Sequence, residues 1–265
     1  MCDISKADGS WGSQSADSVR CFASRHHYDT MTKKQLGYIL QRGTSPIDGH
    51  PFVVILTMNS GNRKTGNMPQ VWILREDVDP VTAVSTGADR TICGDCPHRK
   101  QADGTRSCYV NVGQAPLSVW RAYHSGSYRS DLHCMEAPDA VRGRRVRFGA
   151  YGDPALISRA VFRLISNAAD GHTAYTHQWR EPWAAWARGS MQASCDGLAD
   201  YLEASAHGWR TFRVTPKGSG AEQGKQCPAT VDGSSAQCVT CALCDGAKAD
   251  IWVSAHGSGA RYVAA

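Results

Sequence analysis

Long apolar segments are missing from this sequence, and nowhere do eighteen apolar residues follow one another, so no stretch is typical of a transmembrane helix. The first residues, beginning Met-Cys-Asp-Ile-Ser-Lys, contain no apolar core of the kind that a secretory signal needs. A strong charge of either sign is also missing: the formal net charge of +5 permits an anionic partner such as nucleic acid without requiring one. These absences predict a protein that has no membrane partner and stays in the cytoplasm where it is made.

Cysteine, in contrast, is plentiful, with 11 among 265 residues. Disulfides are rare in a reducing cytoplasm, so we expect these thiols to be ligands of a metal or cluster, with a few buried structural thiols among them. A chain of this length can bury a complete core, and one α/β domain of this size is ordinary.

The densest group of cysteines lies near the end of the chain and consists of Cys227, Cys238, Cys241 and Cys244. The last three have the spacing C-x2-C-x2-C, in which a tight turn returns every third residue to the same side. Tetrahedral zinc and a cubane iron–sulfur cluster both take four such sulfurs. The spacing predicts a metal or cluster site and leaves zinc and iron–sulfur open.

A second cysteine group lies in the first half of the chain. Cys93 and Cys96 form a C-x2-C pair, and eleven residues separate Cys96 from Cys108. Two arrangements fit three cysteines. His98 completes a closed zinc site with four ligands, or an iron–sulfur cluster takes three cysteines and keeps one iron open.

From residue 144 onward strands and helices alternate. Strands are expected near 145–151, 173–176, 190–195, 209–215 and 250–255. Helices are expected over 155–169 and over 197–207, the second with Asp196 as its N-cap. Such alternation predicts parallel βα units. Two β-rich runs at 51–57 and 71–74 and a short amphipathic helix from Met31 to Leu40 come before them. The predicted fold is α/β: residues 1–90 are a lead-in and β-rich segment, and residues 91–265 form an incomplete (β/α) barrel.

The ends of the predicted strands carry polar residues, and in a barrel of parallel strands the chemistry gathers at the carboxyl ends. These residues are Asp153, His177, Cys195, Thr215 and His256. Asp153 suits ligand binding and also suits capping the next helix, with Pro154 at its first position. His177 suits either a substrate contact or a structural hydrogen bond, and Cys195 is interpreted as a buried thiol. The cysteine-rich loops are expected at the same carboxyl rim.

The chain resembles the phage gene-product-88-like family and, behind it, the radical SAM superfamily, over roughly residues 88–260. The resemblance is carried by Cys93-x2-Cys96, Ser107-Cys108-Tyr109, the run Gly149-Ala-Tyr-Gly-Asp-Pro154, the four cysteines from Cys227 to Cys244, and Ile251-Trp-Val-Ser-Ala-His256-Gly257.

Membership would imply a [4Fe-4S] cluster that is held by three cysteines after the first barrel strand and binds S-adenosylmethionine. Cys93, Cys96 and Cys108 match those three cysteines, although the family spacing is C-x3-C-x2-C and this chain has C-x2-C-x11-C. Gly152, Asp153 and Pro154 stand where a glycine-rich motif binds the cofactor, with His177 as a further candidate. The four-cysteine tail then resembles an auxiliary cluster, or it supplies the cofactor-binding cluster itself.

The resemblance also implies a reaction. A radical SAM enzyme encoded by a phage, in the host cytoplasm, would take electrons from an external donor and act on a modified nucleobase in DNA. The most concrete expectation is an isomerase that rearranges an amino acid adduct on a modified thymine. The alternative is a non-catalytic zinc-knuckle protein that presents the basic run 142–147 to nucleic acid.

Overall fold

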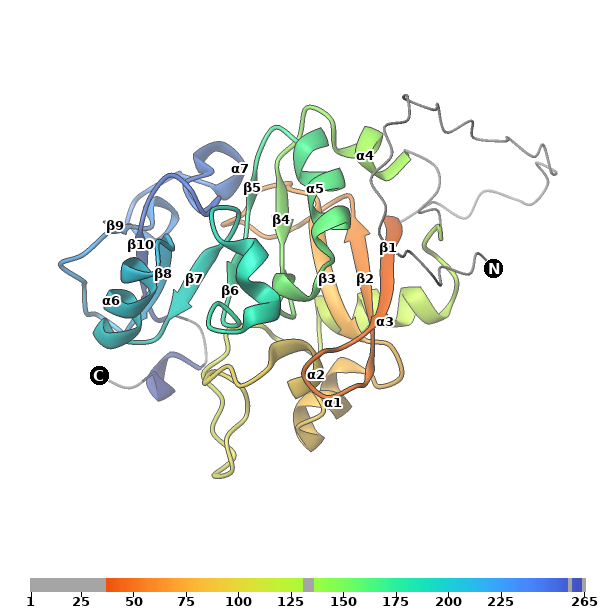
Figure 1. The fold of residues 1–265 in the computed structure, drawn as a ribbon, viewed down its shortest axis with the longest axis horizontal. Helices are drawn as coiled ribbons and strands as arrows, with labels where there is room; N and C mark the ends of the chain where they lie inside the picture. Colours follow the sequence, from red (N-terminus) through yellow and green to blue (C-terminus); the bar gives the residue numbers. More distant parts are fainter. Residues whose placement is uncertain (1–36, 131–135, 257–258, 264–265) are drawn as a thin grey trace, which may run out of the picture. The chain divides into compact units, whose positions relative to one another are not determined.

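A computed structural model describes residues 37–130, 136–256 and 259–263 of the chain. The fold is mixed α/β and contains two sheets of five strands each (Figure 1). Cys2, Cys21 and Cys134, and Gly257 of the family resemblance, lie outside the described residues.

The first sheet has the strand order β1-β2-β3-β4-β5. Its strands are β1 (Gly37–Thr44), β2 (Pro51–Thr57), β3 (Gln70–Arg75), β4 (Val146–Phe148) and β5 (His172–Thr173). β1, β2 and β3 pair antiparallel, whereas β3, β4 and β5 pair parallel. The prediction of paired strands at 51–57 and 71–74 is confirmed. Because β3 pairs with β4, the strands before residue 90 continue one sheet with strands after it.

The second sheet is all parallel and has the order β6-β7-β8-β10-β9. Its strands are β6 (Tyr175–Thr176), β7 (Gln192–Cys195), β8 (Thr211–Thr215), β9 (Lys225–Gln226) and β10 (Ile251–Ser254). Every central strand is short, and β7 is buried along its whole length. Parallel strands are covered on both faces, which accounts for this burial.

One residue, Ala174, separates β5 from β6 and joins the two sheets. Its N–H donates to the carbonyl oxygen of Cys244 (3.0 Å), and its own carbonyl accepts from the N–H of Gln192 (3.0 Å). Cys244 of the cysteine-rich tail thus accepts a backbone hydrogen bond from the residue that connects the last strand of the first sheet to the first strand of the second.

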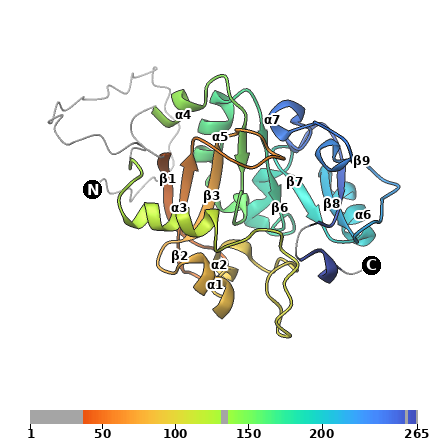
Figure 2. The same cartoon turned by 180° about the vertical axis from the view of Figure 1, so that it is seen from behind.

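Helices cover the sheets and the strand ends. The α-helices are α1 (Pro80–Thr86), α2 (Arg90–Cys93), α3 (Ala115–His124), α4 (Glu136–Val141), α5 (Arg159–Ala168), α6 (Leu198–Ala206) and α7 (Cys238–Cys241). The 3-10 helices are η1 (Pro154–Leu156), η2 (Pro182–Ala187), η3 (Pro228–Thr230) and η4 (Ala260–Tyr262). α3 lies against β3, where the indole N–H of Trp120 donates to the carbonyl of Arg75 (3.1 Å; Figure 2).

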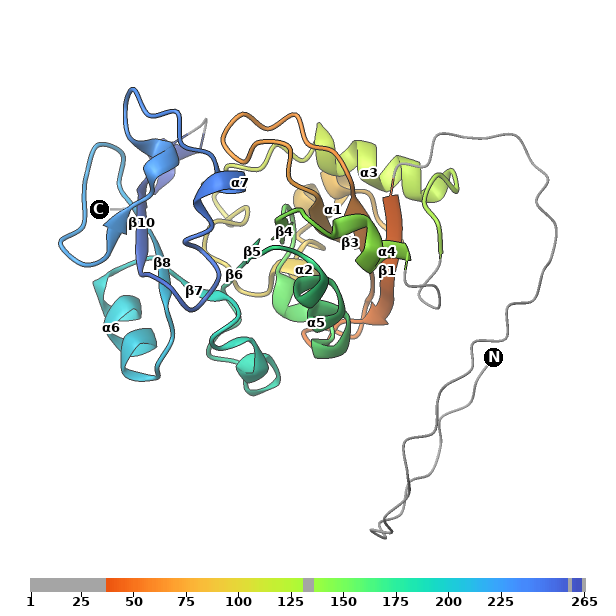
Figure 3. The same cartoon turned by 90° about the horizontal axis from the view of Figure 1, so that it is seen from above.

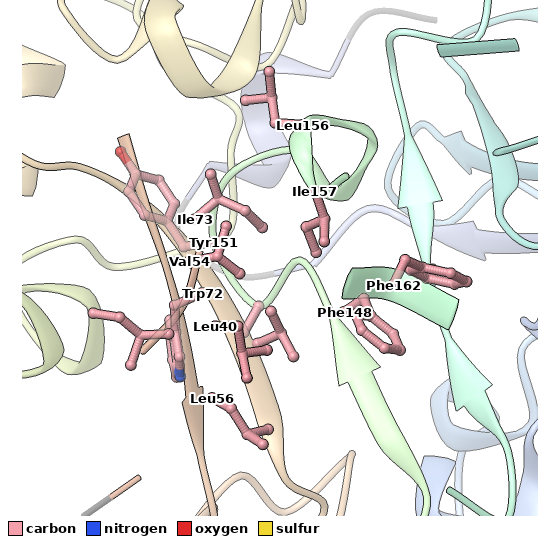
Figure 4. Close-up of a cluster of buried hydrophobic side chains, with 14 of the residues drawn as sticks. Leu40, Val54, Leu56, Trp72, Ile73, Phe148, Tyr151, Leu156, Ile157 and Phe162 are labelled. Atoms are coloured by element: carbon pink, nitrogen blue, oxygen red, sulfur yellow. The ribbon is translucent and has the colours of Figure 1, made fainter. Parts of the chain in front are cut away.

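The helix predicted over 155–169 is present in two parts, η1 and α5. Ser158 caps α5, because its hydroxyl accepts from the N–H of Val161 (3.3 Å). The buried face of α5 packs onto the first sheet, and Phe162 meets Phe148 of β4 with ring centroids 4.4 Å apart. Figure 4 shows these two rings beside the cluster that includes Leu40, Val54, Ile73 and Ile157.

Two local predictions were wrong. A helix was expected over 31–40, of which residues 31–36 lie outside the described residues. Gly37 to Leu40 belong to strand β1 instead, because pairing with β2 overrides the local helical pattern. Asp196 does not cap α6, whose capping position is Gly197. The carboxylate of Asp196 is directed elsewhere, as described below.

No helix in the described part of the chain combines the length and the apolar character that crossing a bilayer requires.

Candidate functional site

A cavity of about 470 Å³ lies at the carboxyl ends of the parallel strands. Both cysteine groups contribute to its wall, with Cys93, Cys96 and Cys108 from the first group and Cys227 and Cys238 from the tail. Gly152, Asp153 and His177 also line it, whereas Pro154, Cys241 and Cys244 do not. The structure therefore brings most of the predicted site residues to one cavity.

The first cysteine group is held by its own backbone. Cys93 ends α2, the N–H of Cys96 donates to the carbonyl of Cys93 (3.4 Å), and the N–H of Cys108 donates to the carbonyl of His98 (2.9 Å). Gly94 adopts φ +59° directly after Cys93, and a Cβ there would lie 2.4 Å from the side chain of Gln178. Burial raises the pKa of the Cys93 thiol, and the neighbouring Cys96 adds to the effect. A bound cation would oppose this effect and favour thiolates.

His98 does not turn toward the cysteines. Its Nδ1 lies 2.7 Å from the hydroxyl of Ser107, and its Nε2 lies 2.8 Å from Oδ1 of Asp196. The second contact is an ion-pair distance without the alignment of a hydrogen bond. Because other groups meet both ring nitrogens, this conformation gives the three cysteines no fourth ligand from His98.

His177 stands beside both the cysteines and Asp196. Its Nε2 lies 3.8 Å from the sulfur of Cys96 and 3.5 Å from Oδ2 of Asp196. Burial by itself lowers the pKa of His177, but Cys96 and Asp196 raise it well above its ordinary value. Burial by itself raises the pKa of Asp196, whereas its close contacts with His177 and His98 lower it overall. The contacts with Cys96 and Asp196 thus favour the protonated form of the His177 imidazole, and those with the two histidines favour the carboxylate form of Asp196.

The Gly152-Asp153-Pro154 turn ties three segments together. Oδ1 of Asp153 accepts from the N–H of Ala155 (2.9 Å), and Oδ2 accepts from the N–H of His177 (2.8 Å). The N–H of Asp153 donates to the carbonyl of Ile92, next to Cys93 (2.7 Å). Burial raises the pKa of Asp153. These contacts give the carboxylate a positioning role, with Pro154 at the first position of η1 as the sequence indicates, and cofactor contact by the turn stays a prediction.

The four-cysteine tail is fastened to the loop between β2 and β3. The N–H of Cys238 donates to the carbonyl of Lys64 (3.0 Å), and the N–H of Val239 donates to that of Thr65 (3.0 Å). Figure 3 shows α7 beside this loop. Burial raises the pKa of Cys244 to about 12, and Cys227, Cys238 and Cys241 each contribute further. The four thiols are therefore close enough to affect one another electrostatically.

The spacing of the sulfurs bears on which metal they suit. Among the described residues, one group of three possible metal ligands has donor atoms within 4.8 Å of one another, and it consists of His98, His177 and Asp196. No three cysteine sulfurs in the described residues come that close to one another. A single tetrahedral zinc needs sulfurs about 3.8 Å apart, given Zn–S bonds of about 2.3 Å. An iron–sulfur cluster holds its cysteines farther apart, because several irons lie between them. The thiol donors are of the kind that both zinc and iron–sulfur clusters take, and in the described residues no three of the sulfurs are close enough together to share one ion.

The other side of the cavity is aromatic and cationic. Tyr175 packs on Phe212 with ring centroids 4.3 Å apart, and Arg147 of β4 donates from Nη2 to the hydroxyl of Tyr109 (2.5 Å). The hydroxyl of Tyr151 is buried and, within the described residues, has no hydrogen-bond partner. Apolar walls with a few such polar groups are typical of ligand pockets.

Three of these residues were missed from the sequence. Asp196 follows the strand-end residue Cys195 and was assigned to a helix cap. Arg147 falls in a basic run that was interpreted as a surface, and Tyr109 was used only for the family resemblance. The strand that contains Arg147 has three residues, all of them buried, so its sequence pattern gives no signal for the direction of this side chain.

Comparison with models of protein families, with curated proteins and with solved structures finds no match to this chain. Its function is therefore argued from the cavity and the groups that line it.

Proposed function

We propose that this protein is an iron–sulfur enzyme of radical SAM type whose reaction takes place in the cavity between its two cysteine groups. The observation that carries the proposal is that Cys93, Cys96 and Cys108 line the same cavity as Cys227 and Cys238. Zinc knuckles that only stabilise a surface would not need a shared cavity of about 470 Å³.

The order of the elements supports this proposal. Parallel strands β3, β4 and β5 are followed along the chain by the parallel strands β6, β7, β8 and β10. The first cysteine group follows β3, and Gly152-Asp153-Pro154 follows β4. This is the order that an incomplete (β/α) barrel of radical SAM type would have, with its chemistry at the carboxyl ends of the strands.

The three-cysteine group is the better candidate for the cluster that binds S-adenosylmethionine. Because His98 is directed to Ser107 and Asp196, Cys93, Cys96 and Cys108 would leave one iron open for the cofactor. When bound, the cluster would supply the electron that cleaves the C–S bond of S-adenosylmethionine and releases a 5′-deoxyadenosyl radical. The tail cysteines would hold an auxiliary cluster.

The residues of the chain would bind, orient and shield. Tyr151, Tyr175 and Phe212 form apolar walls that keep water from a reactive species. His177 and Asp196 present a charged pair beside Cys96 that would orient polar groups of the ligands. The substrate we propose is a modified nucleobase in phage DNA, on which an amino acid adduct is rearranged, with an external electron donor.

Metal analysis after anaerobic purification tests the proposal. We expect a brown protein with about four irons per cluster. Alanine variants of Cys93, Cys96 and Cys108 together should lose one set of irons, and alanine variants of Cys238, Cys241 and Cys244 the other. Cys195→Ser serves as the matched control that keeps the iron content.

Cleavage of S-adenosylmethionine is the second measurement. The reduced protein should release 5′-deoxyadenosine, and the triple variant of the first cysteine group should not, while the tail variant should still do so. A colourless protein with stoichiometric zinc would overturn the proposal in favour of a zinc-knuckle protein that binds nucleic acid. Absence of 5′-deoxyadenosine with several reductants, from a protein that holds iron, would exclude the radical SAM chemistry.

A further inference from the structure

The guanidinium of Arg147 is a buried charge in the wall of the cavity. The residue is 8 % exposed, it belongs to β4, and it lines the same cavity as both cysteine groups. Its one side-chain hydrogen bond in the described structure runs from Nη2 to the hydroxyl of Tyr109, which is not a carboxylate. Its Nε is buried and has no hydrogen-bond partner among the described residues.

No carboxylate in the described part of the chain lies within ion-pair distance of Arg147. Buried charges are usually paired, because removing an ion from water without a partner is costly. The two carboxylates that line the cavity are engaged elsewhere: Asp153 accepts from backbone N–H groups, and Asp196 faces two histidines. The positive charge of Arg147 is thus left for a group that enters the cavity.

Two further cationic residues line the cavity, Arg63 and Lys64, and both belong to the loop between β2 and β3. The N–H of Cys238 donates to the carbonyl of Lys64, and the side-chain amide of Gln237 donates to the carbonyl of Arg63 (2.7 Å), so both residues of the loop are held in place. A negatively charged molecule would therefore meet exposed cations from the loop and a buried one in the wall, which draws it inward.

We propose that Arg147 binds an anionic group, a carboxylate or a phosphate, of the molecule that occupies the cavity. A guanidinium presents donors in a planar fork that matches both anions. Tyr109 fixes one end of the fork, and Nε is the donor that remains to be used. The inference deepens the proposed function by giving its ligand a negative charge, but the binding itself needs the cavity and not the radical chemistry.

Matched pairs of probes identify the source of the anion. The first pair is thymidine 5′-monophosphate and thymidine, which differ in the phosphate. The second pair is S-adenosylmethionine and its decarboxylated form, which differ in the carboxylate. Equilibrium dissociation constants are measured by calorimetry on the anaerobically purified full-length protein, with its metal content determined. We expect one pair to show a preference of about ten- to hundredfold for the anionic member.

Three variants complete the design. Arg147→Gln should abolish the preference, and Arg147→Lys should retain part of it, because lysine keeps the charge but not the fork. Arg142→Gln is the control, since it removes the same charge from an exposed residue that does not line the cavity. Competition by inorganic phosphate in the unaltered protein gives a measurement that does not depend on the folding of a variant.

Several results would overturn the inference. One is equal affinity for both members of both pairs, and another is an undiminished preference in Arg147→Gln. A third is loss of tail-bound metal in Arg147→Gln with the preference retained, since the guanidinium would then neutralise a metal centre at Cys238. Absence of 5′-deoxyadenosine formation would refute the radical chemistry without affecting these affinities, so the two proposals fail separately.

Discussion

Replacement of Gly152 by alanine tests whether the fold requires a glycine at this position, because of its backbone conformation and its close approach to β3. Gly152 has φ +78°, and a Cβ added there would lie 2.4 Å from the carbonyl oxygen of Ile73 in β3. The left-handed conformation costs a residue with a side chain about 1–2 kcal/mol. The close contact involves backbone of a central strand that cannot yield easily, and overpacking of this kind adds about 1–3 kcal/mol. The sum is about 2–5 kcal/mol.

Gly143→Ala is the matched control, because Gly143 has φ +70° and a Cβ there meets no atom within 4 Å. It should cost only the conformational part. In a chain of this size 1 kcal/mol shifts Tm by about 2–4 °C, so we expect losses of about 10 °C for Gly152→Ala and about 4 °C for Gly143→Ala. Thermal unfolding followed by circular dichroism measures both. Equal losses would refute the close approach to β3, and a stable Gly152→Ala that no longer binds S-adenosylmethionine would assign the glycine to the cofactor alone.

Three further predictions concern buried titratable or charged groups. In metal-free protein, Arg147→Met should raise the free energy of unfolding by about 1–3 kcal/mol, because it removes a buried charge that the chain does not pair; a lower Tm would contradict this. Burial raises the pKa of Cys195 to about 12, so iodoacetamide near pH 8 should leave this thiol unmodified in peptide maps of the folded protein and alkylate it after unfolding. Burial lowers the pKa of His172 below its usual 6.5, so the unfolded state binds more protons just below that pH and stability falls as the pH drops from about 7 toward the folded pKa. His172→Gln should remove that part of the fall, and an identical pH dependence of Tm in both proteins would count against it.

Much of the fold could be predicted from hydrophobic pattern. The runs at 51–57 and 71–74 are unbroken apolar segments, and the apolar face of 155–169 recurs with helical period, so β2, β3 and α5 lie where expected. β1 was missed because the residues around Leu40 have a helix-like pattern, and only pairing with a distant strand makes them extended. The sequence around Leu40 does not indicate that this segment will pair with β2.

The candidate site was predicted in part for a similar reason. Parallel strands place their carboxyl ends together, so residues that follow a strand, such as His177 and Asp153, could be grouped before the structure was known. Residues inside a strand, such as Arg147, depend on which face the pleat turns inward, and a three-residue strand is too short to show it. The orientation of His98 toward Asp196 depends on two loops far apart in the sequence. The partial barrel and the cluster types stay predictions.

The hydrogen bond between Ala174 and Cys244 has a consequence for how the protein is made. The wall of the cavity needs Cys227, Cys238 and the residues around β10, all of which belong to the last forty residues of the chain. Domains form as their segments leave the ribosome, at about 5–20 residues per second. The first cysteine group therefore emerges well before the tail can close the junction between the two sheets. If the proposed cluster is inserted during synthesis, the site of Cys93, Cys96 and Cys108 is most accessible in that interval, before the residues around Cys227 and Cys238 pack beside it.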